Sequence, residues 1–201
     1  MALIAFTDNQ PDFAAADQRP GTHYLEILLE ADTLARVADA IACARTQGAD
    51  WVVFSNHCGA NFVERPAPDV RRFAQRVIEL GADAYYGHCA HLCQGIEIHQ
   101  GRPILYDTGD FIDDYAVDPL LRNDHSCLFQ LMFEHGQLQR IELIPVTLDV
   151  AQVRLAHGED FTAIAARMER LCAELGTSLE RQTDRLVYTP QPRAQSPRET
   201  W

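Results

Sequence analysis

Two short apolar runs, each ending at a histidine, flank an amphipathic segment. The run Trp51–Phe54 leads to His57, and the run 84–86 leads to His88. Between them, apolar side chains recur at helical spacing over residues 70–78. A helix that connects two strands of one sheet makes those strands parallel. The pattern therefore predicts a βαβ unit, which makes the chain an α/β protein.

Apolar periodicity also predicts the elements on either side of this unit, which give a mostly parallel sheet followed by a β-rich C-terminal portion. The segment 190–201 is rich in Pro, Arg, Gln and Ser, a composition typical of a disordered tail, so we expect one domain over residues 1–189. The expected elements are a strand at 2–6, an extended piece at 24–28, a helix at 33–47 capped by Asp32, hairpins at 95–106 and 127–144, and a helix at 161–175.

The charge balance excludes some classes of partner. The formal net charge is -12, and all 17 basic residues are Arg. A protein that follows a nucleic-acid backbone needs a basic face, so we expect no nucleic-acid partner. The negative field would also repel an anionic substrate unless a metal ion or a local Arg cluster reversed it.

Neither a membrane span nor a signal peptide is expected. No run approaches the roughly 18 apolar residues that cross a bilayer, and no basic residue precedes the short apolar run near Met1. The six cysteines are scattered without the spacing of a disulfide scaffold. We therefore expect reduced thiols and a cytoplasmic protein.

Three histidines lie at the ends of the two predicted strands, and they carry the chemistry that the sequence suggests. His57 follows the first strand, and His88 and His91 follow the second. Parallel strands place their carboxyl ends at one edge of a sheet, so the three imidazoles should converge there. Imidazole is a common ligand of first-row divalent metals. The alternative is that each is a hydrogen-bonded loop residue.

Three nearby polar residues are accessory candidates. Asn56 could donate to a bound ligand or cap a turn. Asp107 and Asp110 flank a glycine at a strand end, where they could supply a carboxylate, orient a ligand histidine or form a polar turn.

The other chemically interesting residues have simpler interpretations. Cys58 and Cys89 adjoin the histidines, and a thiolate nucleophile is the minor alternative to a pocket-wall role. Four histidines and three arginines are expected at the surface, although the arginines could also recruit an anion. These are His99, His125, His135 and His157, together with Arg65, Arg71 and Arg72.

An ordered string of motifs resembles the capsule-synthesis CapA family from about Ile4 to about Leu186. Asn56-His57-Cys58-Gly59 resembles the family's H-W-G element, and Gly87-His88-Cys89-Ala90-His91 resembles its G-H-x-P-H element. Segments similar to the family follow at 94–98, 101–104 and 106–111. Cys58 stands where the family has Trp, and Cys89-Ala90 replaces His-Pro or Ser-Pro, so the pocket wall differs.

The resemblance implies a fold and a chemistry. The family is similar to calcineurin-like metallophosphoesterases, which implies part of a layered α-β-β-α sandwich with divalent ions of the Mn, Fe or Zn class. It implies that His57, His88 and His91 are metal ligands. The implied role is poly-gamma-glutamate capsule or envelope-polymer synthesis, with metal-assisted hydrolysis of a phosphate ester or action on an anionic polymer.

The chain resembles only the C-terminal portion of that family. The family's G-D and Asn-His elements lie upstream of the segment that residues 2–9 resemble, and with them the carboxylate that bridges two ions. We expect weak metal binding, poor hydrolysis and self-association through an exposed sheet edge around residues 2–6. Two alternatives stay open: a non-catalytic binding or assembly subunit, and a mononuclear three-histidine zinc hydrolase or lyase.

Overall fold

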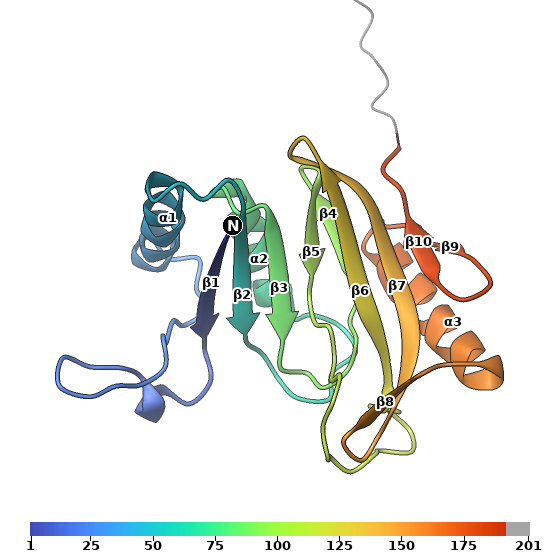
Figure 1. Cartoon of the computed structure of the whole chain (residues 1–201). Helices are drawn as coiled ribbons and strands as arrows, with labels where there is room; N and C mark the ends of the chain where they lie inside the picture. Colours follow the sequence, from blue (N-terminus) through green and yellow to red (C-terminus); the bar gives the residue numbers. More distant parts are fainter. Residues whose placement is uncertain (192–201) are drawn as a thin grey trace, which may run out of the picture.

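A five-stranded sheet forms the first half of the structure, a computed structural model that describes residues 1–191 (Figure 1). Its strand order is β1-β2-β3-β5-β4, with β1, β2, β3 and β5 parallel and β4 antiparallel to β5. The strands are β1 (Ala2–Thr7), β2 (Val52–His57), β3 (Ala84–His88), β4 (Ile96–His99) and β5 (Arg102–Leu105).

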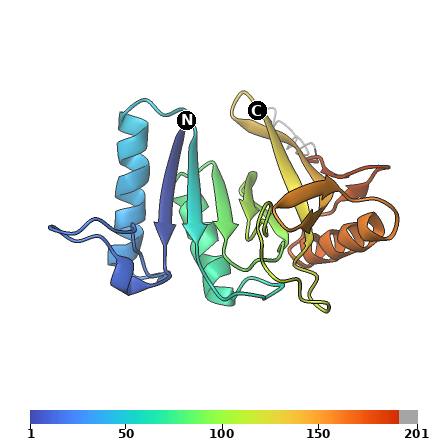
Figure 2. The ribbon, with the colours of Figure 1, turned by 60° about the horizontal axis from the view of Figure 1, so that its bottom comes forward.

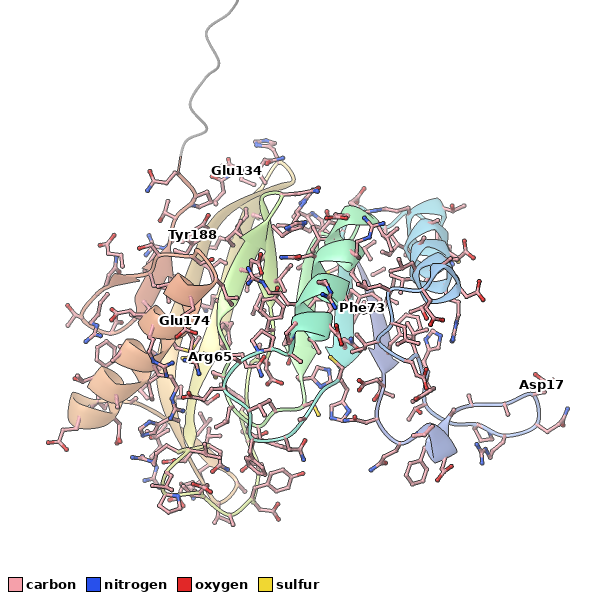
Figure 3. All side chains as sticks on the ribbon, turned by 180° about the vertical axis from the view of Figure 1, so that it is seen from behind. Asp17, Arg65, Phe73, Glu134, Glu174 and Tyr188 are labelled. Atoms are coloured by element: carbon pink, nitrogen blue, oxygen red, sulfur yellow. The ribbon has the colours of Figure 1, made fainter. Side chains whose placement is uncertain are left out.

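Two helices cover one face of this first sheet. α1 (Ala31–Thr46) and α2 (Pro68–Glu79) pack their apolar stripes onto the strands, and Figure 3 shows Phe73 on α2. Phe73 and Phe54 are fully buried, with ring centroids 6.2 Å apart. The predicted βαβ unit is therefore β2-α2-β3, because the apolar face of the crossover helix is buried against its own two strands.

The opposite face of the first sheet carries no helix. Because side chains alternate along a strand, Leu3 and Ala5 point away from the core residues Ile4 and Phe6. Leu3 is 66% exposed, and Tyr86 on β3 is 40% exposed. We call this surface, with Leu3, Ala5, Val53 and Tyr86, the bare face; His57 and His88 lie on it at the carboxyl ends of their strands.

The second half is an antiparallel sheet covered by one helix, α3 (Gly158–Glu174) (Figure 2). A second core of buried side chains lies between α3, this sheet and strands β4 and β5. The strands are β6 (His125–Glu134), β7 (Gln137–Asp149), β8 (Gln152–Leu155), β9 (Glu180–Arg181) and β10 (Leu186–Tyr188), in the order β6-β7-β10-β9. β8 pairs with the last residues of β7, on the side opposite β6.

A buried carboxylate ties several elements of the first sheet together. Asp83, just before β3, accepts from Arg45 of α1 at 2.6 Å and from the backbone N–H of Val52 at 2.8 Å. Arg102 of β5 lies 3.1 Å from its other oxygen. Asp83 is 5% exposed, so these partners offset the cost of burying its charge.

The α/β class and most elements agree with the sequence analysis, with four corrections. The expected extended piece at 24–28 is not a strand and contributes one isolated bridge, Thr7 to Tyr24. The residue at the N-cap of α1 is Glu30 rather than Asp32. β2 and β3 continue through their histidines, and β8, β9 and β10 were not predicted. The expected tail from 190 lies mostly outside the described residues.

A long excursion follows β1 before α1 begins. It contains a short 3-10 helix, η1 (Pro11–Phe13), and a turn whose tip, at Asp17, projects away from the body (Figure 3). It returns so that Thr22 and His23 lie beside the end of β1. In the part of the chain that the structure describes, no helix is both long and apolar enough to cross a bilayer.

Candidate functional site

The carboxyl ends of three parallel strands meet at one rim of the first sheet. The register aligns Thr7 of β1 with His57 of β2, and His57 with His88 of β3. These three side chains share the bare face because they have the same parity along their strands. A pocket of about 770 Å³ opens at this rim, lined by Ala5, Phe6, Thr7, Asn9, Gln10, Thr22, His23, His57, Asn61, His88, His91 and Tyr115.

His57 and His88 are neighbours at the base of this histidine pocket. Their ring centroids lie 5.3 Å apart. The Nδ1 atom of His57 lies 3.3 Å from Oγ1 of Thr7, whereas Nε2 of His88 lies 3.1 Å from Oγ of Ser55. Each ring therefore keeps one nitrogen free of these contacts. Burial, together with the nearby His57, lowers the pKa of His88 and favours the neutral imidazole that a metal binds.

His91 reaches the same pocket from the loop after β3. Its backbone is left-handed, with φ of 56°, and its Nδ1 donates to Oδ1 of Asp110 at 2.8 Å. The rings of Phe62 and Tyr115 flank it at centroid distances of 5.6 Å and 4.9 Å. The carboxylate and the two rings fix the imidazole so that Nε2 is the nitrogen left for a ligand.

Asp107 holds the histidine loop from behind rather than lining the pocket. Its carboxylate is 3% exposed and accepts from the backbone N–H groups of Ala90 at 2.7 Å and Gly109 at 2.9 Å. Burial raises its pKa to about 6, against the lowering effect of these hydrogen bonds. Asp107 thus braces the chain between His88 and His91.

Asn56 lies on the other face of the sheet from the histidines. It is the neighbour of His57 within β2, so its side chain points toward the helices, where it is 1% exposed. Its amide donates to the Tyr85 hydroxyl at 3.0 Å. The structure therefore does not bring Asn56 into the pocket.

Both cysteines beside the histidines are buried. Cys58 is 8% and Cys89 6% exposed. Burial raises the pKa of Cys58 to about 12 and also raises the pKa of Cys89. Neither is a thiolate at neutral pH, which favours the pocket-wall interpretation. All six cysteines are free, and Cys43 is the exposed one.

His125 corrects the expectation of a surface histidine. It is 4% exposed, and its Nε2 lies 3.1 Å from Oδ1 of Asp160 in the first turn of α3. A neighbouring arginine, Arg122, pairs with both Asp124 and Asp160, so the contact belongs to a polar junction between the start of β6 and α3. Sequence patterns miss such a partner because it lies 35 residues away.

The three arginines near the histidine loop do not line the pocket. Arg65 donates to both carboxylate oxygens of Glu174 in α3, at 2.7 Å and 2.9 Å (Figure 3). Arg71 pairs with the buried Glu97, and Arg72 pairs with Asp69. Their charges are engaged in holding elements together, so an anion in the pocket would find none of them.

Several pocket residues were absent from the sequence-based site. Thr7 and Asn9 could have been found, because β1 is a third parallel strand that ends at the same rim. His23 and Tyr115 come from long loops, and no periodicity places them. The ring of His23 lies 3.8 Å from that of Phe6, and Tyr115 packs against His91.

The sequence matches a known family over this part of the fold. The family described as Bacterial capsule synthesis protein PGA_cap matches residues 1–115, which span the first sheet and the histidine pocket. The chain belongs to this family. The CapA resemblance noted from the motifs is therefore confirmed.

Individual relatives carry related names. The chain is 28% identical over 180 residues to a "Probable polyglutamine synthesis accessory protein" of Mycobacterium tuberculosis, covering 87% of this chain and 47% of the relative. It is 28% identical to the "PGA biosynthesis protein CapA" of Bacillus subtilis, covering 75% and 37%. For the "Capsule biosynthesis protein CapA" of Bacillus anthracis, the values are 24%, 74% and 34%. The chain spans about half the length, or less, of these relatives.

The imidazoles of the PGA_cap pocket are suitable metal ligands, but too few ligands are grouped to complete a metal site. Within residues 1–191, no three His, Cys, Asp or Glu side chains are grouped so that they could hold one ion. Carboxylates do lie close behind the histidines. Oδ1 of Asp8 and Oδ2 of Asp110 are buried and have no hydrogen-bond partner in the described part of the chain, and burial raises the pKa of both groups. The imidazoles thus form a partial donor set.

Proposed function

We propose that this PGA_cap protein acts in the synthesis of a poly-gamma-glutamate capsule or related envelope polymer. We further propose that the histidine pocket is a metal-assisted site for hydrolysis of a phosphate ester or related ester. One observation carries the second proposal: the rings of His57 and His88, 5.3 Å apart, end two adjacent parallel strands in the pocket that His91 also lines.

Each histidine would offer one nitrogen to the site, for which the family resemblance implies two ions rather than one. His57 offers Nε2 and His88 offers Nδ1, the nitrogens not engaged with Thr7 and Ser55. His91 offers Nε2, and Asp110 orients it. A bound ion of the Mn, Fe or Zn class would bind substrate oxygens and lower the pKa of a bound water.

The electrostatics of the pocket make a metal necessary for an anionic substrate. No Arg is among its lining residues, and the chain carries a formal charge of -12. Without a cation, a phosphate or a polyanion would meet amide, hydroxyl and imidazole groups, with no Arg among them, in a negative field. We therefore expect anion binding to depend on the metal.

A non-catalytic binding or assembly subunit is the second candidate. The incomplete donor set favours it, because the described residues contain no group of three ligands and no carboxylate lines the pocket. In this case the pocket binds a partner or polymer without turnover. The same observation disfavours a mononuclear three-histidine zinc enzyme, which needs three imidazoles on one ion.

The α-β-β-α sandwich implied by the family resemblance remains part of the proposal. In such a sandwich, a further layer would lie on the bare face beside the histidine pocket. Exposure of Leu3 and Tyr86 on that face supports this arrangement, because apolar strand residues are normally covered. Such a layer could also bring the carboxylates that the pocket lacks.

Metal titration of the intact chain tests the site. We expect Mn²⁺ or Zn²⁺ to bind weakly to the wild type, and the affinity to fall in each of His57→Ala and His88→Ala by about tenfold or more. His135→Ala is the matched control, because that imidazole is 92% exposed and lies in the β6–β7 turn. Equal affinities in all four proteins would remove the metal site.

Turnover separates the two candidate functions. A metal-dependent hydrolysis of an aryl phosphate diester that is lost in His88→Ala supports the enzyme. Metal binding that depends on His57 and His88, without hydrolysis of this diester, supports the binding subunit.

A further inference from the structure

Strand β1 forms an outer edge of the first sheet. It pairs with β2 along its whole length, from Ala2 opposite Val52 to Thr7 opposite His57. On its other side, the pairing that the described chain contributes is one isolated bridge, between Thr7 and Tyr24. Figure 1 shows this strand at the border of the sheet.

The backbone of β1 shows which groups are left without a partner. Thr7 donates its N–H to the His23 carbonyl at 3.1 Å and accepts from the Leu25 N–H at 2.9 Å, so its peptide groups point to the outer side. Ala2 donates inward, to the Trp51 carbonyl. The backbone N–H and C=O groups of alternate residues point the same way along a strand. Those of Leu3 and Ala5 therefore point toward the open edge, like those of Thr7.

This edge lacks the usual protection against pairing. Exposed edges in proteins are commonly interrupted by Pro, a bulge or a charged side chain. Residues 2–6 contain none of these, since they read Ala-Leu-Ile-Ala-Phe in regular register with β2. Leu3 is 66% exposed, and Ala5 is also exposed. The edge can therefore accept another strand without removing a charge from water.

We propose that a second copy of this chain pairs with the edge, β1 against β1, antiparallel about a two-fold axis through Ile4. In this register Leu3 of one copy faces Ala5 of the other, and the two residues exchange a pair of N–H to C=O hydrogen bonds. Symmetry repeats the pair, so the outward groups of Leu3 and Ala5 are satisfied in both copies. The Thr7 position, already bonded to residues 23 and 25, limits the length of the pairing.

A second copy suits this edge better than an unrelated strand because the free groups are self-complementary. Leu3 and Ala5 direct their backbone groups to the open edge, and Ile4 between them directs its groups to β2. A two-fold axis at Ile4 therefore places Leu3 of each copy opposite Ala5 of the other. The net charge of -12 on each copy opposes the association, whereas the edge itself is uncharged. Added salt should therefore strengthen the dimer by screening the repulsion between the bodies of the two copies.

Sedimentation equilibrium of the full chain, over a hundredfold range of concentration, tests the dimer. We expect the average mass to rise from monomer to dimer with concentration, and more steeply at higher salt. Ala5→Pro removes an outward N–H without removing a hydrogen bond to β2, and Leu3→Lys adds charge at the edge. Each should weaken dimerisation by about tenfold or more.

Leu155→Lys is the matched control, because Leu155 is 61% exposed on β8, away from β1. Thermal unfolding of each variant shows whether it is folded, and Leu3→Lys tests the edge even if Ala5→Pro does not fold. A monomer at all concentrations overturns the proposal. So does a dimer that folded Leu3→Lys leaves intact, or one that Leu155→Lys weakens equally.

Discussion

The Nδ1 atom of His91 lies 2.8 Å from Oδ1 of Asp110, across 19 residues of sequence. This contact joins the loop after β3 to the loop after β5, two parallel strands that are neighbours in the first sheet. A carboxylate on one imidazole nitrogen fixes the tautomer and leaves the other nitrogen available. Asp110 thereby acts on the pocket although it is not among the lining residues.

Replacing this carboxylate should weaken metal binding. We expect Asp110→Asn to lower the affinity for Mn²⁺ by about 10 to 100-fold, because the amide no longer holds His91 with a charge-assisted hydrogen bond. Calorimetric titration of the purified chain measures this change. Asp114→Asn, an exposed carboxylate four residues away, is the control. Matching affinities in the two variants would count against the role assigned to Asp110.

The raised pKa of Asp107 predicts a pH-dependent stability. A carboxyl with a folded pKa of about 6, above its usual 3.8, binds its proton more tightly in the folded state, so its contribution falls as pH rises between these values. The loss is about 3 kcal/mol from pH 3.8 to above pH 6. Urea unfolding of the wild type and of Asp107→Asn, at pH 3.8 and above pH 6, isolates this contribution to the free energy of unfolding. The variant has no carboxyl group at position 107 to titrate.

As pH rises, the free energy of unfolding of the wild type should fall relative to that of Asp107→Asn. Asp149→Asn serves as control because that carboxylate is 62% exposed. A difference that stays constant with pH would show that Asp107 ionises normally in the fold.

Thiol chemistry tests the interpretation of Cys58 and Cys89. With a pKa of about 12, Cys58 is a thiolate in roughly one molecule in ten thousand at pH 8. We expect one fast-reacting thiol per native chain, Cys43, because the other five are buried. Reaction with an aromatic disulfide reagent should lose its fast phase in Cys43→Ser. A fast phase that persists in this variant and disappears in Cys89→Ser would revive the nucleophile alternative.

The buried carboxylate of Asp83 should matter more for stability than an exposed one. Asp83→Ala leaves Arg45 and the Val52 N–H without their acceptor, so we expect a loss of about 3 kcal/mol in the free energy of unfolding. Removing the exposed carboxylate that pairs with Arg154, by Asp149→Ala, should cost less than about 0.5 kcal/mol. Urea denaturation compares the two, and equal losses would contradict the role given to Asp83.

Local patterns were enough to predict the βαβ unit and the rim at which the histidines gather. Apolar runs at β2 and β3 and the helical spacing of α2 depend on neighbouring residues, and a crossover helix makes the strands parallel. His57 and His88 then had to end side by side. The same rule would have placed Thr7 and Asn9, because β1 is also parallel to β2.

Contacts between distant segments decided the rest. Side chains alternate between the two faces up to the end of a strand. Because β2 continues to His57, Asn56 is still within the strand, and its side chain points into the core on the face opposite the histidine. The burial of His125 against Asp160 and the packing of Tyr115 on His91 arise from loops whose course no periodicity fixes. The amino-acid sequence thus determined the parallel βαβ unit and the family, because these follow from short-range hydrophobic patterns and ordered motifs. The tertiary structure alone decided which polar groups meet, because a hydrogen bond depends on distance in space rather than on separation along the chain.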